Sequence, residues 1–260
     1  MQKRFHSPVL MYHAIGLPVV TRRDEQINVS AADFQRQMRV LLTLGYTVRP
    51  FYEIVDSLVS ARSLSRRTLA ITFDDAYLSV GTVAAPIMKS LGIVGTTFVV
   101  SSWSGAGEVI GLENGRLNSP VLDWDGLRAL VDQSWEVGGH TMSHVHLDSL
   151  EDSAAMDEIS KGKLDVEQAV GTELATFCYP FGHINVRTSE LVRAAGFRGA
   201  CTVRSGIAAR RSDPYLIPRV KIAYRDGVVG LLYRLLVRPS LPTFRTRRRS
   251  HTMSRDSTSL

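Results

Sequence analysis

The chain has 260 residues, of which 44% are hydrophobic and 22% are charged, an ordinary balance for a soluble globular protein. This length suits one α/β barrel or one large α/β domain. The net charge is +6, but residues 239–260 contain five arginines and one aspartate, a local charge of 5 − 1 = +4, so the remaining body is close to neutral. A nucleic-acid partner is therefore not expected, because such a surface spreads basic residues over a folded face.

The sequence carries few signals of compartment. The two cysteines, Cys178 and Cys201, are too few for a disulfide framework. The first residues contain charges but no long apolar core and no small-residue cleavage site, and no stretch reaches the length of a membrane-spanning helix. On the sequence as written, the expected location is the cytoplasm or the cytoplasmic membrane surface.

Apolar patterning and turn residues predict strands and helices that alternate along the chain. Strands are expected at 8–13, 46–48, 69–75, 95–100, 135–137, 175–179, 199–203 and 216–222. Helices are expected from the N-cap Ser30 to Gly45 and at 51–59, 84–91, 123–130, 150–170, 189–195 and 230–238, with loops at 16–28 and 101–119. This order favours an α/β fold, a (β/α) barrel of seven or eight strands in one domain over residues 1–238, followed by a basic, disordered tail over 239–260.

Titratable residues gather where predicted strands end. The 69–75 run ends in the adjacent carboxylates Asp74 and Asp75, which resist burial unless a cationic group lies between them. His140 and His144, four residues apart, follow the strand at 135–137. One carboxylate and two imidazoles can hold one metal ion and leave coordination positions open, as in hydrolytic metal sites.

Three ordered motifs resemble those of the polysaccharide deacetylases, carbohydrate esterase family 4. They are Thr72-Phe-Asp-Asp75, His140-Thr-Met-Ser-His144 and Tyr179-Pro-Phe-Gly182, and the likeness runs from about residue 8 to about residue 222. The segments Leu10-Met-Tyr-His13 and Ile217-Pro-Arg219 are more similar to the branch that deacetylates poly-N-acetylglucosamine exopolysaccharides. The resemblance implies a distorted (β/α) barrel with one divalent metal ion, usually Zn²⁺ and sometimes Co²⁺ or Ni²⁺, and an N-acetylated glycan as substrate.

The resemblance also implies roles for the motif residues. Asp75, His140 and His144 would hold the metal ion, which lowers the pKa of water toward neutrality. Asp74 would accept a proton from that water as general base, and the resulting hydroxide would attack the acetamide carbonyl of the sugar.

The turn formed by Tyr179, Pro180 and Phe181 would contact the substrate, with the Phe181 N–H stabilising the oxyanion. Much of the family protonates the leaving amine with a late histidine, but this chain has no histidine between His183 and His251. The exopolysaccharide branch uses the histidine of its first strand instead, which is His13 here. That role requires the barrel to close and bring the first strand beside the site.

Two departures from the family pattern affect the prediction. Cys178 stands where the family often has an arginine, and the usual Asp-Trp motif is absent. Arg219 is the candidate partner that keeps Asp74 ionised, with a plain surface ion pair as the alternative. The identity of the substrate stays open. Trp103, in a polar stretch, is a candidate for stacking on sugar rings. His146 is interpreted as a non-ligand, and His183 as a solvated loop histidine, with contact to the substrate as the alternative.

Three other functions fit parts of this pattern. A facial triad of a non-haem iron oxygenase also uses two histidines and one carboxylate, but a second adjoining acid has no purpose there. A hydrolase of a small or cyclic amide could use the same barrel, and so could a catalytically inactive glycan-binding protein. The apolar, arginine-containing segment 230–238 and the basic tail either lie on an anionic membrane or simply close the barrel and extend into solvent.

Overall fold

The computed structural model describes residues 6–19, 22, 24–60, 64–65, 67–106 and 119–237. The predicted basic tail, 239–260, and positions 107–118 of the predicted long loop lie outside these residues.

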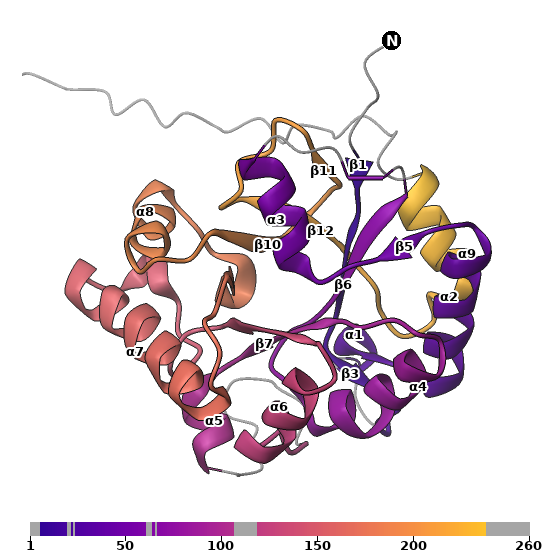
Figure 1. Ribbon diagram of the computed structural model, residues 1–260, viewed down its shortest axis with the longest axis horizontal. Coiled ribbons are helices and arrows are strands. Elements are labelled where there is room, and N and C mark those ends of the chain that lie inside the picture. The colour runs from indigo at the N-terminus through magenta and orange to yellow at the C-terminus, as the bar shows by residue number, and fades with distance from the viewer. Residues whose placement is uncertain are drawn as a thin grey trace, which may run out of the picture.

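Seven parallel strands close into a barrel (Figure 1), which confirms the predicted fold. Their order is β2-β12-β10-β9-β8-β7-β6, and β6 pairs back with β2 to complete the ring. These strands are β2 (Val9–Tyr12), β6 (Thr68–Phe73), β7 (Thr96–Val99), β8 (Glu136–Gly139), β9 (Thr176–Cys178), β10 (Gly199–Ser205) and β12 (Ile217–Lys221). An eighth strand, β5 (Thr47–Val48), pairs with the beginning of β6.

Short elements flank the barrel, and some of them lie within the predicted loop 16–28. The strand β1 (His6–Ser7) pairs with β11 (Ala208–Ala209), and β3 (Ala14–Ile15) pairs with β4 (Asn28–Val29). A one-turn helix, α1 (Asp24–Ile27), precedes β4, so the prediction of an unstructured stretch is wrong for 24–28.

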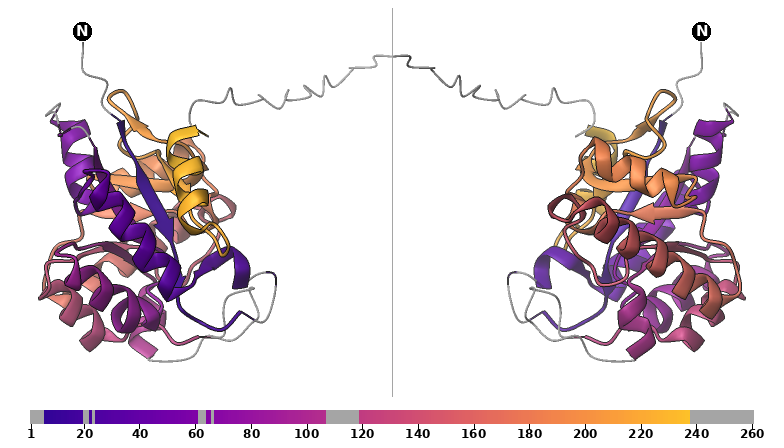
Figure 2. Two further views of the ribbon diagram at one scale, coloured as in Figure 1. Left: turned by 90° about the vertical axis from the view of Figure 1, so that its right-hand side faces the viewer. Right: turned by 90° about the vertical axis from the view of Figure 1, so that its left-hand side faces the viewer.

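Helices surround the barrel (Figure 2). They are α2 (Ala31–Thr43), α3 (Phe51–Val59), α4 (Ala85–Ser90), α5 (Ser101–Ala106), α6 (Trp124–Val131), α7 (Asp152–Val170), α8 (Val186–Ala194) and α9 (Gly227–Leu232), with the π-helical turns η1 (Val80–Ala84) and η5 (Tyr233–Val237) and the 3₁₀ turns η3 (Leu147–Ser149) and η4 (Pro180–Gly182). Among the described residues, no helix is long and apolar enough to cross a bilayer.

Side-chain caps define the beginning of three helices, α2, α6 and α8. Ser30 caps α2 by accepting from the Asp33 N–H, as predicted. The helix predicted at 189–195 begins earlier, at Val186, because Asn185 and Thr188 form a reciprocal capping box. The loop predicted over 101–119 is wrong at its beginning, since 101–106 forms α5.

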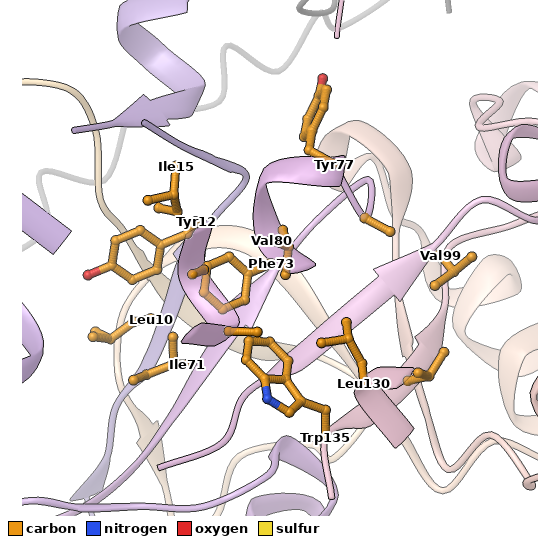
Figure 3. Close-up of a cluster of buried hydrophobic side chains, with 14 of the residues drawn as sticks. Leu10, Tyr12, Ile15, Ile71, Phe73, Tyr77, Val80, Val99, Leu130 and Trp135 are labelled. Carbon is orange, nitrogen blue, oxygen red and sulfur yellow. The ribbon is translucent and has the colours of Figure 1, made fainter. Parts of the chain in front are cut away.

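Side chains of the barrel strands alternate between two hydrophobic cores, as the two-residue period of a strand requires. On β6, Ile71 and Phe73 face the surrounding helices. There the ring of Phe73 packs between Tyr12 and Trp135, at centroid distances of 5.7 and 5.6 Å (Figure 3). Ala70 instead joins a cluster to which six of the seven barrel strands contribute, which places that cluster inside the ring.

Helix α3 covers the end of the barrel at which the strands begin. Its Phe51 lies in the interior cluster. The Phe51 N–H donates to Thr96 Oγ1 and the Tyr52 N–H to Glu136 Oε2, both at 2.9 Å. Two otherwise unpaired N–H groups at the helix start are thereby satisfied. Helix α3 thus closes the end of the barrel at which the strands begin. The opposite end, at which the strands finish, is left for a site.

Candidate active site

The closed barrel brings together the predicted residues that follow its strands. Asp74 follows β6, His140 follows β8 and His13 follows β2. Since β2 and β6 are neighbours in register, with the Asp74 N–H donating to the Tyr12 carbonyl at 3.0 Å, His13 and Asp74 lie side by side. The predicted requirement that the first strand reach the site is met.

Asp75, His140 and His144 form a buried cluster with the geometry of a metal site. Asp75 Oδ1 lies 3.6 Å from His140 Nε2 and 3.4 Å from His144 Nε2, and all three ligand atoms fall within 4.8 Å of one another. His140 Nδ1 lies 2.6 Å from the Cys178 carbonyl, which leaves Nε2 of the neutral ring as the lone-pair donor. The donor set therefore fits one divalent ion.

A strained loop presents His144 to this cluster. Thr141 has φ = 68°, an unusual value for a β-branched residue, and its Oγ1 accepts from the His144 N–H at 2.8 Å. The Ser143 N–H and hydroxyl both donate to the Glu158 carboxylate of α7, at 2.9 and 2.6 Å. Helix α7 approaches so closely that a Cβ on Gly162 would lie 2.7 Å from the Thr141 carbonyl carbon. Helix and loop are thereby fixed to each other.

Backbone strain is concentrated at this end of the barrel. Of the eight non-glycine residues with positive φ in the described part of the chain, five lie in these loops: Asp75, Ala76, Thr141, His144 and Phe181. Such conformations cost about 1–3 kcal/mol each and persist only where the surroundings impose them, which occurs most often at functional sites.

Asp74 is paired with Arg219 inside the barrel. Arg219 Nη1 donates to Oδ1 at 2.6 Å and Nη2 to Oδ2 at 2.7 Å, and both side chains are buried. Burial raises the pKa of a carboxyl group, but the Arg219 guanidinium outweighs it and holds the pKa of Asp74 well below its usual range. The predicted partnership is present, and the alternative of a surface pair is wrong.

The small Cys178 side chain makes room for this guanidinium. Arg219 Nη2 donates to Cys178 Sγ at 3.1 Å, and Nε donates to the Thr202 carbonyl at 2.9 Å. The guanidinium of Arg219, from β12, thus lies beside Cys178 on β9, the position at which the family often has an arginine.

His13 completes the group around Asp74. Its Nε2 lies 3.9 Å from Asp74 Oδ2. Burial lowers the pKa of His13, with Asp74 and Asp75 opposing the shift and Arg219 and Lys221 adding to it. The imidazole is therefore neutral at pH 7.

The turn η4 lies beside the cluster and exposes one aromatic side chain. Tyr179 and Pro180 are buried, so they can shape the turn, whereas Phe181 is exposed. Phe181 has φ = 58°, and its ring centroid lies 4.5 Å from that of His144. Trp103 does not have the exposed position expected of a sugar-stacking residue. It is buried in α5, with its ring 5.2 Å from His144.

The sequence motifs match a known family. The polysaccharide deacetylase model matches residues 61–200, more than half of the chain. This chain belongs to the polysaccharide deacetylase family. YxkH of Bacillus subtilis (strain 168), a protein named for the same family, is 24% identical over 222 residues, which cover 85% of this chain and 73% of that protein.

Solved structures of deacetylases share the barrel. Streptococcus pyogenes deacetylase PplD, solved in complex with acetate, superposes with a TM-score of 0.79 at 20% identity. The match covers 89% of this chain and 99% of PplD. IcaB from Ammonifex degensii gives 0.74 at 24% identity, over 87% and 95%. At these identities the likeness establishes the fold.

Proposed function

We propose that this protein is a metal-dependent hydrolase that removes N-acetyl groups from an N-acetylglucosamine-containing polysaccharide or oligosaccharide. The observation that carries the proposal is the position of Asp74. It is held by Arg219 and lies beside both His13 and the cluster of Asp75, His140 and His144. Membership of the polysaccharide deacetylase family supports the reaction class.

Asp75, His140 and His144 would hold a divalent ion, with Zn²⁺ favoured by two imidazoles and a carboxylate and Co²⁺ or Ni²⁺ as alternatives. When bound, the ion would supply Lewis acidity, which lowers the pKa of water and polarises the amide carbonyl. This contribution matters here, because a carboxylate whose pKa is as low as that of Asp74 is a weak base on its own.

The remaining chemistry is assigned to the chain's own groups. Asp74 accepts a proton from water while the oxygen of that water attacks the acetamide carbonyl. We assign stabilisation of the oxyanion to the N–H of Phe181, whose ring contacts that of His144. When the carbon–nitrogen bond breaks, the sugar nitrogen needs one proton to leave as an amine. His13 begins neutral, so it must gain a proton before it can act as an acid. That proton is the one that Asp74 accepts from water, and it passes from Asp74 to His13 across the 3.9 Å between them and then to the sugar nitrogen.

Two alternatives keep the same barrel. A hydrolase of a small or cyclic amide would use the same base and ligands, and an inactive glycan-binding protein would need neither. The strain and the buried charge pair gathered at this end favour a working catalyst over a binding remnant.

The test is acetate release from N-acetylglucosamine oligomers after the metal is removed and Zn²⁺ is restored. We expect zinc-dependent release that falls by about 10²–10⁴-fold in Asp74→Asn and in His13→Ala, the usual contribution of a general base or acid. Asp157→Asn, which changes an exposed carboxylate on α7, is the matched control. Circular dichroism verifies folding of each variant.

Release that survives His13→Ala would show that another group protonates the amine. Zinc binding without release from any glycan, combined with release from small amides, would favour the amide hydrolase. Activity that is unchanged in Asp74→Asn would overturn the mechanism.

We also propose that the carboxyl-terminal helix contacts an anionic membrane surface. Val229, Tyr233, Leu236 and Val237 recur at helical spacing, and all are exposed, with Val229 82% and Leu236 57% accessible. The sequence that follows contains the arginine cluster, which complements anionic lipid.

Sedimentation with phosphatidylglycerol vesicles tests this contact. We expect binding to these vesicles, no binding to phosphatidylcholine, and loss of binding in Leu236→Glu. Val186→Glu, at another exposed apolar position, on α8, is the control. Equal binding of the wild type and Leu236→Glu would refute the role of this helix.

A further inference from the structure

A second group of metal-ligating side chains lies at the rim of the first. His146 and Asp148 follow His144 in the chain, and His183 follows the turn η4. The ring centroids of His146 and His183 are 4.7 Å apart, and His183 Nδ1 lies 3.6 Å from Asp148 Oδ2. One ligand atom from each of the three residues falls within 4.8 Å of the others, and all three residues are exposed.

The backbone around these side chains is fixed by contacts that do not occupy them. The Ser149 N–H and hydroxyl donate to the His146 carbonyl, at 3.1 and 2.7 Å. Arg187 Nη2 donates to the Leu147 carbonyl at 3.1 Å, while its Nη1 donates to Asp152. The Arg187 guanidinium is thus paired with Asp152. The ion-pair contact of the Asp148 carboxylate is with His183.

An aromatic ring connects the two groups. Phe181 stacks on His146, with a centroid distance of 4.0 Å and an interplanar angle of 10°. Its edge-to-face contact with His144 has a centroid distance of 4.5 Å. The exposed group is therefore separated from the buried one by a single ring, and the two are distinct because they share no residue.

We propose that His146, Asp148 and His183 form a second binding site for a divalent transition-metal ion. Two imidazoles and one carboxylate suit Zn²⁺, Ni²⁺ or Cu²⁺, whereas Mg²⁺ and Ca²⁺ prefer oxygen ligands. Because the side chains are exposed, water completes the coordination, and this ion binds more weakly than one in the buried cluster. A bound ion would join the loop after β8 to the turn that carries Phe181.

The experiment counts Zn²⁺ ions bound by the full, untagged chain after chelation, using equilibrium dialysis and calorimetric titration. We expect two ions per wild-type chain, taken up in a tight and a weak step. In His183→Ala and in Asp148→Asn, the weak step weakens by about tenfold or more while the tight step is unchanged. In Asp75→Asn, the tight step is lost and the weak step stays.

Asp157→Asn, another exposed carboxylate, is the control and keeps both steps. A second readout is amide hydrogen exchange, which we expect to slow at 145–149 and 181–184 when the weak step is filled. The proposal is overturned if the wild type binds one ion only, or if His183→Ala and Asp148→Asn bind as many ions as the wild type with equal affinity.

Discussion

Arg219 holds both carboxylate oxygens of Asp74, with N–O distances of 2.6 and 2.7 Å, across the interior of the barrel. Their strands are not neighbours, because β2 lies between β12 and β6. The pair therefore requires β2 to be paired with both β12 and β6, and the catalytic geometry that we propose depends on this long-range assembly. A buried, two-pronged pair of this kind fixes the orientation of Asp74 as well as its charge.

Replacement of Arg219 by methionine should destabilise the protein strongly. The Asp74 carboxylate would remain buried without its partner, and removal of one member of such a pair costs about 3–5 kcal/mol. The free energy of unfolding from urea denaturation measures this loss. The double variant Arg219→Met/Asp74→Asn should recover part of it, because no unpaired charge is then buried. A double variant whose loss equals the sum of the two single losses would contradict the coupling.

Much of the barrel and of the site could be predicted from the sequence. The alternation of apolar runs and amphipathic stretches predicted all seven barrel strands, since each run is buried and bounded by polar residues. The positions of Asp74 and His140 at strand ends then followed from the parallel arrangement.

Other features could not be predicted, because they depend on contacts between distant segments. Glu158 and Gly162 lie within an ordinary amphipathic helix, and nothing in their local pattern indicates that α7 supports the loop of His144. The helix α5 begins with the serines Ser101 and Ser102 and contains Gly105, so composition favoured a loop there. Trp103 nevertheless packs into a small cluster with Val100 and Val121, and this contact is invisible in the sequence.

A methyl group on Gly162 should weaken metal binding. Alanine is the better helix former by about 1 kcal/mol, so a gain in stability would be expected at an unconstrained position. Here the new Cβ would lie 2.7 Å from the backbone of Thr141 and of Met142, and the loop that presents His144 must move. We expect weaker Zn²⁺ binding in Gly162→Ala by calorimetry. Ser153→Ala, at an exposed position of α7, should leave the affinity unchanged, and equal affinity in both variants would refute this account.

Removal of metal should lower the melting temperature. An ion bound only by the folded chain stabilises it by RT ln(1 + [L]/Kd), about 4 kcal/mol at a thousandfold excess over Kd. Scanning calorimetry before and after chelation measures the shift, and restored Zn²⁺ should reverse it. At Zn²⁺ concentrations that fill only the tight step, the melting temperature of His140→Ala should be the same with and without Zn²⁺. A zinc-dependent shift of normal size in this variant would show that His140 is not a ligand.

Glu136 should make the stability of the fold depend on pH. Its carboxylate is buried at the start of β8, and burial raises its pKa above the ordinary value of 4.5, although donors from Thr176, Tyr52 and Thr96 oppose the shift. Above pH 4.5 the folded chain therefore keeps a proton that the unfolded chain has lost. The free energy of unfolding falls as the pH rises through this window, until the folded carboxyl also ionises.

Glu136→Gln isolates this effect, because an amide has nearly the same shape and cannot ionise. Its oxygen can still accept from Tyr52 N and Thr96 Oγ1, and its nitrogen can donate to Thr176 Oγ1 once that hydroxyl rotates. Urea unfolding at a series of pH values should show a smaller decline in the variant than in the wild type as the pH rises above 4.5. Glu136→Ala should be less stable at every pH, since each buried donor left without an acceptor costs about 1–3 kcal/mol. Identical slopes for the wild type and Glu136→Gln would mean that the carboxyl group of Glu136 titrates normally, and that its role in holding α3 against the barrel does not depend on its charge.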